Sequence, residues 1–121
     1  MILFRKKVTL GLMLTPVEDA YGRTIYNLRI SVNQECNFSC FFCHEEGLWG
    51  QRPADKTYLS PEELQTTVNT LTHFGIREIK ITGGEPLLRK DIESIVKNLS
   101  VLNPIEDISM TTNGYYLEEH A

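Results

Sequence analysis

Residues 60–86 read SPEELQTTVNTLTHFGIREIKITGGEP, and this stretch decides the fold. Ser60 is followed by a proline and two glutamates, which is the arrangement of a helix N-terminus with a serine cap and a capping box. We therefore expect a helix that begins after Ser60 and stops at Gly75. Its expected buried residues are Leu64, Val68 and Leu71.

Alternating apolar and polar residues predict three strands, at residues 27–32, 77–82 and 107–112. A second helix is expected between the last two strands, with Asp91 as its N-cap. Its apolar face contains Ile92, Ile95, Val96 and Leu99. A third helix should begin near Leu117.

The alternation of strands and helices predicts an α/β fold with a parallel sheet and right-handed crossovers. A complete (β/α) barrel takes roughly 250 residues, whereas this chain has 121. The expected architecture is therefore a β-α-β-α-β unit, which is only about half of a (β/α) barrel.

The composition is that of an ordinary soluble protein, with 41% hydrophobic and 23% charged residues. The net charge of −4 argues against nucleic acid as a partner, since such binding usually needs a basic face. The apolar start, residues 1–14, is interrupted by three basic residues and is too short to span a membrane. We expect a cytoplasmic protein with no membrane partner.

Three cysteines lie in the long loop expected after the first strand, at about residues 33–59. They are Cys36, Cys40 and Cys43, the only cysteines of the chain. An odd number of cysteines in the cytoplasm favours a metal or a reactive thiol over disulfides. Three thiolates can hold three irons of a four-iron cluster and leave the fourth open. The alternatives are a zinc site completed by His44, and three thiols that bind no metal.

Polar residues on the three strands point to a binding surface. Arg29, Lys80 and Thr111 are expected on the sheet side that faces a barrel interior, towards the carboxyl ends where α/β folds bind ligands. For any one of them alone, the solvated side of a sheet is the slightly favoured interpretation, and it is their convergence that points to a ligand. Gly83 and Gly84 follow the second strand and allow close approach of the backbone to a ligand. Read alone, the Gly-Gly-Glu-Pro sequence is more typical of a tight turn.

Together, the Cys-x-x-x-Cys-x-x-Cys spacing and the Ile-Thr-Gly-Gly-Glu-Pro sequence resemble the radical S-adenosylmethionine (SAM) superfamily. Four shorter segments resemble its GTP 3′,8-cyclase family, which opens molybdenum cofactor biosynthesis. They are residues 19–23, 27–32, 82–91 and 111–114. The resemblance covers about residue 19 to the last residue. It implies a variable leader at residues 1–18. At residues 19–121 it implies the amino-terminal β-α-β-α-β part of an incomplete (β/α) radical SAM barrel.

The resemblance also implies the roles of individual residues. Cys36, Cys40 and Cys43 would ligate a [4Fe-4S] cluster whose open iron is chelated by SAM. The remaining SAM contacts would come from Phe42, beside the adenine, and from Gly83, Gly84 and Glu85, which receive the methionine amino group. The contacts to GTP would come from Arg29, Lys80 and Thr111.

In that family, SAM is cleaved to a radical that removes the C3′ hydrogen of GTP, and the ribose then joins C8 of the guanine. The resemblance implies GTP as the substrate, a flavodoxin- or ferredoxin-type electron donor and a homodimer in full-length members. The second cluster of the family lies in a carboxyl-terminal region that this chain does not contain. We therefore expect the amino-terminal portion of a cyclase, which binds a cluster and, weakly, SAM but does not cyclise GTP alone. The remaining alternatives are the start of a peptide- or cofactor-maturing radical SAM enzyme and, less favoured, a zinc-binding structural module.

Overall fold

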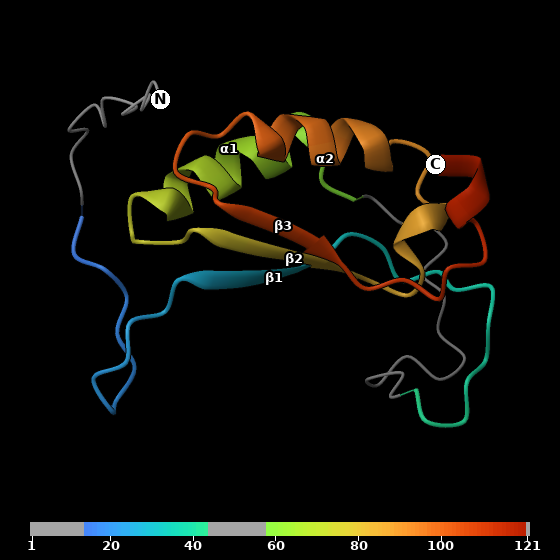
Figure 1. Ribbon diagram of the computed structural model, residues 1–121, viewed down its shortest axis with the longest axis horizontal. Coiled ribbons are helices and arrows are strands. Elements are labelled where there is room, and N and C mark those ends of the chain that lie inside the picture. Colours follow the sequence, from blue (N-terminus) through green and yellow to red (C-terminus); the bar gives the residue numbers. More distant parts are fainter. Residues whose placement is uncertain (1–13, 44–57, 121) are drawn as a thin grey trace, which may run out of the picture.

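The computed structural model describes residues 14–43 and 58–120 (Figure 1). Three strands alternate with two α-helices and two short 3₁₀ helices. The elements are β1 (Asn27–Ser31), α1 (Pro61–Thr72), β2 (Glu78–Thr82), η1 (Pro86–Leu88), α2 (Ile92–Ser100), β3 (Asp107–Met110) and η2 (Leu117–His120).

The strands form one parallel sheet in the order β1-β2-β3, and both α-helices cover the same face of it (Figure 1). Every second strand residue points to the helices. The buried cluster between the two layers contains Val32, Leu64, Val68, Ile79, Ile81, Ile92, Ile95 and Leu99. This arrangement confirms the predicted α/β fold class, which arises because apolar side chains recur every second residue in the strands and on one stripe of each helix.

Helix α1 begins as the sequence predicted and ends earlier. Ser60 Oγ accepts a hydrogen bond from the Glu63 amide at 3.2 Å, and the Glu63 carboxylate accepts one from the Ser60 amide at 2.8 Å. The helix stops at Thr72, three residues before Gly75, which takes a left-handed φ of +99°. The expected burial of Leu71 was wrong, since Leu71 is half-buried and Thr72 is buried. Thr72 continues the i, i+4 stripe that faces the sheet.

The cap predicted for α2 was also wrong in its chemistry. Asp91 occupies the N-cap position, but its side chain makes no capping hydrogen bond. Its carboxylate instead accepts one from Arg89 Nε at 2.6 Å. A charged, forked donor two residues away competes successfully with a backbone amide for this acceptor.

The expected strands are each longer than the observed ones. β1 ends one residue early, β2 begins one residue late, and β3 ends at Met110 instead of residue 112. Beyond β3 the amide of Thr111 still donates to Ile81 O at 2.9 Å, whereas the hydroxyl of Thr112 donates to a side chain. The predicted third helix is the 3₁₀ helix η2 within the part of the chain that the structure describes.

The segment before β1 packs against the turn after α1. The Val17 amide donates to Phe74 O at 3.1 Å, and Glu18 forms an antiparallel bridge with Thr24. Residues 1–13 of the expected leader lie outside the described residues, so the boundary near residue 18 stays a prediction. In the described ranges, no helix is both long enough and apolar enough to cross a membrane.

Candidate functional site

Three connections meet at the carboxyl end of the sheet (Figure 1). The first is the cysteine loop, residues 33–59, of which residues 44–57 lie outside the described part. The second is the glycine turn, residues 83–86, which follows β2. The third is the Asn113 segment, residues 111–114, which follows β3. Parallel strands place their carboxyl ends at one edge, so all three connections share it.

The glycine turn packs directly on the backbone of the cysteine loop. The Gly84 amide donates to Asn33 O at 3.1 Å, and the Glu85 amide donates to Glu35 O at 2.7 Å. A β-carbon on Gly83 would overlap the Asn33 side-chain oxygen, and one on Gly84 would overlap the Glu35 carbonyl. The two glycines are therefore required by the contact between loops, a reason that the sequence alone did not reveal.

Glu85 is buried, with 1% of its surface exposed, at the point where the three connections meet. One carboxylate oxygen accepts from Thr112 Oγ1 at 2.7 Å and from the Leu87 amide at 3.0 Å. The other oxygen accepts from the Asn113 amide at 2.7 Å. A carboxylate has about four acceptor positions, so most of them are taken by the protein itself. The expectation that Glu85 receives the SAM amino group stays a prediction.

Asn33 is a second buried polar residue at this edge. Its Nδ2 donates to Glu85 O at 2.8 Å, while its Oδ1 is buried against Gly83 with no hydrogen-bond partner among the described residues. Asn33, the first residue of the cysteine loop, thus ties this loop to the glycine turn. Sequence reasoning missed this residue, because a loop asparagine carries no signal of burial.

Arg89 joins the two ends of the cysteine loop and was also missed. Its guanidinium donates to Val32 O at 2.8 Å, just before the loop, and to Leu59 O at the end of the loop. It also lies over the ring of Tyr58, 5.7 Å from the centroid. The Tyr58 hydroxyl in turn donates to Glu35 at 2.7 Å. These contacts hold both ends of the loop beside the glycine turn.

The three cysteines have free thiols at accessible positions on this loop. Cys36 and Cys43 are exposed and Cys40 is half-buried. In residues 14–43 and 58–120, no three His, Cys, Asp or Glu side chains lie close enough together to hold a metal ion. The structure therefore places the thiols on one loop without gathering their sulfur atoms. His44, the fourth ligand of the zinc alternative, lies outside the described residues.

Phe42 also lies on the surface, with 73% of its area exposed. Its ring packs edge-to-face on Phe41, with the ring centroids 5.1 Å apart. The structure does not bring it to the glycine turn, so its role beside an adenine stays a prediction.

The sheet face opposite the helices carries three rows of polar residues, which we call the polar face. The row nearest the amino ends contains Asn27, Glu78 and Asp107. The middle row contains Arg29, Lys80 and Ser109. The row nearest the carboxyl ends contains Ser31 and Thr82, with Thr111 following β3 beside them.

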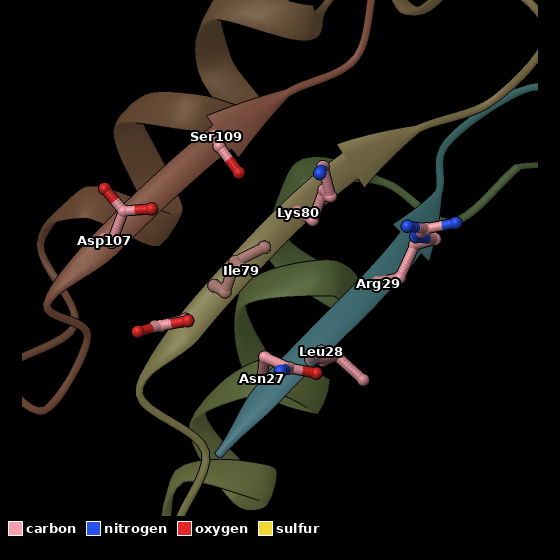
Figure 2. Close-up of a pocket in the computed structure, with 8 residues that line it drawn as sticks. Asn27, Leu28, Arg29, Ile79, Lys80, Asp107 and Ser109 are labelled. Carbon is pink, nitrogen blue, oxygen red and sulfur yellow. The ribbon is translucent and has the colours of Figure 1, made fainter. Parts of the chain in front are cut away.

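Figure 2 shows the hollow that the first two rows line, with a volume of about 260 Å³. Arg29 and Lys80 lie on the same side of the sheet, as the sequence predicted, and the strand register places them opposite each other. Thr111 lies two positions nearer the carboxyl end than Ser109 and does not line the hollow. The polar face is thus acidic at its amino end, basic in the middle and hydroxyl-bearing beside the cysteine loop.

Sequence comparison assigns the chain to a protein family. Residues 30–121 match the radical SAM superfamily. The chain belongs to this superfamily. Its members use a [4Fe-4S] cluster and SAM, so these are the cofactors of the protein, and the zinc module is not supported.

The chain is also similar to three archaeal proteins, each named "Probable GTP 3',8-cyclase". It is 50% identical to the protein of Thermococcus kodakarensis over 103 residues, covering 85% of this chain and 32% of that protein. It is 47% identical to that of Methanocaldococcus jannaschii over 105 residues, covering 87% and 34%. It is 46% identical to that of Pyrococcus horikoshii over 97 residues, covering 79% and 29%. The chain spans about a third of the length of these relatives.

The residues present fit the family's cofactors. Three accessible thiols on one loop supply three iron ligands, and the cysteine count leaves a fourth iron free for another ligand. The glycine turn beside this loop offers Gly84, which is exposed, and Gly83, which is half-buried. The backbone amide of Gly84 itself donates to the cysteine loop, and Gly83 is the residue directly before it.

Proposed function

We propose that this chain forms the SAM-binding edge and part of the nucleotide-binding face of a GTP 3′,8-cyclase. The reaction converts GTP to 3′,8-cyclo-7,8-dihydro-GTP in molybdenum cofactor biosynthesis. Identity of 50% to the Thermococcus kodakarensis protein supports this assignment. The structural observation that carries it is the position of the Arg29–Lys80 row, on the open face of the sheet and one row away from the edge that bears the three cysteines.

In this proposal Cys36, Cys40 and Cys43 hold the cluster, and the glycine turn receives the methionine part of SAM. When bound, the cluster and SAM supply a carbon radical able to abstract hydrogen from GTP. The task of this chain is placement, because the cofactors carry the difficult chemistry. Arg89 and Asn33 fix the cysteine loop against the glycine turn, so that the cluster and the SAM contacts keep one relative position.

Charge on the polar face supports a triphosphate as the ligand of its middle row. Arg29 and Lys80 are cations at neutral pH, and both are exposed. Glu78 and Asp107 lie one row further from the cysteine loop. Their carboxylates repel phosphate, so an anionic group is favoured on the middle row and disfavoured beyond it. Thr111 offers a hydroxyl between this row and the cysteine loop.

The remaining assignments rest on the family resemblance. They are a flavodoxin- or ferredoxin-type electron donor, a homodimer of the complete enzyme, a cytoplasmic location, and the place of Phe42 beside the adenine. They are proposed on that ground.

Anaerobic reconstitution of the 121-residue chain tests the cluster. We expect a brown protein with about four irons and four sulfides per chain, and a changed electron paramagnetic resonance spectrum of the reduced cluster when SAM is added. The triple variant with Cys36, Cys40 and Cys43 replaced by serine is the matched control and should stay colourless. A colourless wild-type protein that holds one zinc ion would overturn the proposal.

GTP separates a cyclase from other radical SAM enzymes. Equilibrium dialysis of the reconstituted chain should detect GTP binding that inorganic triphosphate displaces. No binding of GTP, with a normal cluster and a normal response to SAM, would instead favour a peptide- or cofactor-maturing enzyme.

A further inference from the structure

Asn113 connects the buried carboxylate of Glu85 to the cysteine loop. Its backbone amide donates to Glu85 at 2.7 Å. Its side-chain Nδ2 donates to Asn37 Oδ1 at 2.9 Å and lies 4.0 Å from Cys36 Sγ. Asn113 thus reaches from the buried carboxylate of Glu85 to the first cysteine, Cys36.

The hydrogen bonds determine which way the Asn113 amide points. Its Oδ1 accepts from the Tyr115 amide at 3.0 Å, so the donor end of the side chain must face the cysteine loop. The backbone around it is also fixed. The Thr112 hydroxyl donates to Glu85 at 2.7 Å and accepts from the Gly114 amide at 3.0 Å.

Cys36 is already placed to accept hydrogen bonds. The Phe38 amide donates to its sulfur at 3.4 Å, and Asn113 Nδ2 approaches the same sulfur from another connection of the sheet. The two contacts differ in origin. The Phe38 amide belongs to the cysteine loop and moves with it, whereas Asn113 is held by Glu85 on the turn after β2.

We propose that Asn113 is a positioning residue for Cys36, and that it donates a hydrogen bond to the Cys36 sulfur when the cluster is bound. The second part rests on the function proposed above. Donors to cysteine sulfur stabilise the more negative, reduced state of a cluster and so raise its reduction potential. Through Glu85, the position of this donor is tied to the glycine turn, on which SAM is proposed to bind.

The first test needs no cluster. In the cluster-free chain, the rate of alkylation by iodoacetamide is measured at each cysteine by mass spectrometry. Asn113→Ala should raise the rate at Cys36 by about threefold or more, on the scale of one lost hydrogen bond, and leave Cys43 unchanged. Asn113→Asp keeps the acceptor for the Tyr115 amide but loses the donor, so it should also release Cys36. Asn103→Ala, at an exposed position in the turn between α2 and β3, is the matched control.

The second test uses the reconstituted chain and measures the midpoint potential of the cluster by redox titration. Asn113→Ala should lower the potential relative to wild type and to Asn103→Ala, with unchanged iron and sulfide content. A Cys36 alkylation rate or a midpoint potential equal to that of the control would overturn the inference. Failure of the wild-type chain to form a cluster would instead overturn the proposed function, and the two failures are therefore distinguishable. Circular dichroism of each variant verifies that the chain is folded.

Discussion

Gly84 and Glu35 touch so closely that a β-carbon on the glycine would overlap the glutamate's carbonyl oxygen. The contact joins the turn after β2 to the loop that carries the cysteines. The neighbouring hydrogen bond, from the Glu85 amide to Glu35 O, is 2.7 Å long. The Gly-Gly-Glu-Pro motif, which in the sequence suggests ligand binding, therefore also packs one connection of the sheet against another.

Gly84→Ala should destabilise the chain by about 1–3 kcal/mol, because the added methyl group meets backbone that cannot rotate away. The urea midpoint of unfolding measures this cost. Gly22→Asn is the control, since Gly22 has open space around it and asparagine tolerates its φ of +74°. An unchanged midpoint for Gly84→Ala would contradict the packing role.

Glu85→Gln should also destabilise the protein without cofactors, by about 1–3 kcal/mol. The carboxylate accepts hydrogen bonds from the backbone amides of Leu87 and Asn113. In the glutamine variant, the side-chain NH₂ group would replace one of the two oxygens and leave one of these amides without its acceptor. Chemical denaturation of the cofactor-free chain is the measurement, because bound SAM cannot influence it. Glu106→Gln is the control at an exposed position. Equal stability of the two variants would leave Glu85 without a structural role and favour direct contact with SAM.

The pair of Arg89 and Asp91 should make stability depend on acid pH. The hydrogen bond from Arg89 lowers the pKa of the Asp91 carboxyl below its ordinary value of 3.8. A lowered folded-state pKa means that the contribution is fully present above the unfolded value and is lost as pH falls through the folded pKa. Because the Asp91 side chain is 41% exposed, the effect should be a few tenths of a kcal/mol. Asp91→Asn should be less stable than wild type at pH 7, and the difference should vanish in acid, as pH falls through the lowered folded-state pKa of Asp91. A difference that persists in strong acid would show that the ion pair is not its cause.

Charge changes on the polar face should alter GTP affinity in opposite directions. Lys80→Ala should weaken GTP binding by about tenfold, as expected for one charge-assisted contact. Glu78→Gln should strengthen binding, because it removes a carboxylate from the neighbouring row. Lys90→Ala is the matched control, since Lys90 is exposed and lies outside the polar face. Equilibrium dialysis at low and high salt measures all three, and equal effects of the two lysine variants would contradict a phosphate site at the middle row.

The 121-residue chain should form no cyclic product from GTP under anaerobic, reducing conditions. Arg29, Lys80 and Ser109 are exposed to solvent in the described part of the chain, whereas radical chemistry requires that water be excluded. Mass spectrometry of the reaction mixture measures the product. Its detection would show that this chain alone encloses GTP.

The elements of the fold were predictable because their signals are local. The capping box of Ser60 and the alternation around Ile79 and Ile81 depend on residues a few positions apart. The strand ends were less predictable. β3 ends at Met110, and two residues later the Thr112 hydroxyl bonds to a residue 27 positions earlier, a contact that no local pattern encodes.

The candidate site divides in the same way. The sequence by itself determined the three cysteines, the glycine turn and the cations at positions 29 and 80, because motif spacing and strand alternation are properties of the chain. Only the tertiary structure decided that Glu85 is buried under three hydrogen bonds, that Arg89 joins the ends of the cysteine loop, and that Asn113 points to Cys36. The physical reason is that these contacts join connections far apart in the sequence, which become neighbours only because parallel strands place their carboxyl ends at one edge.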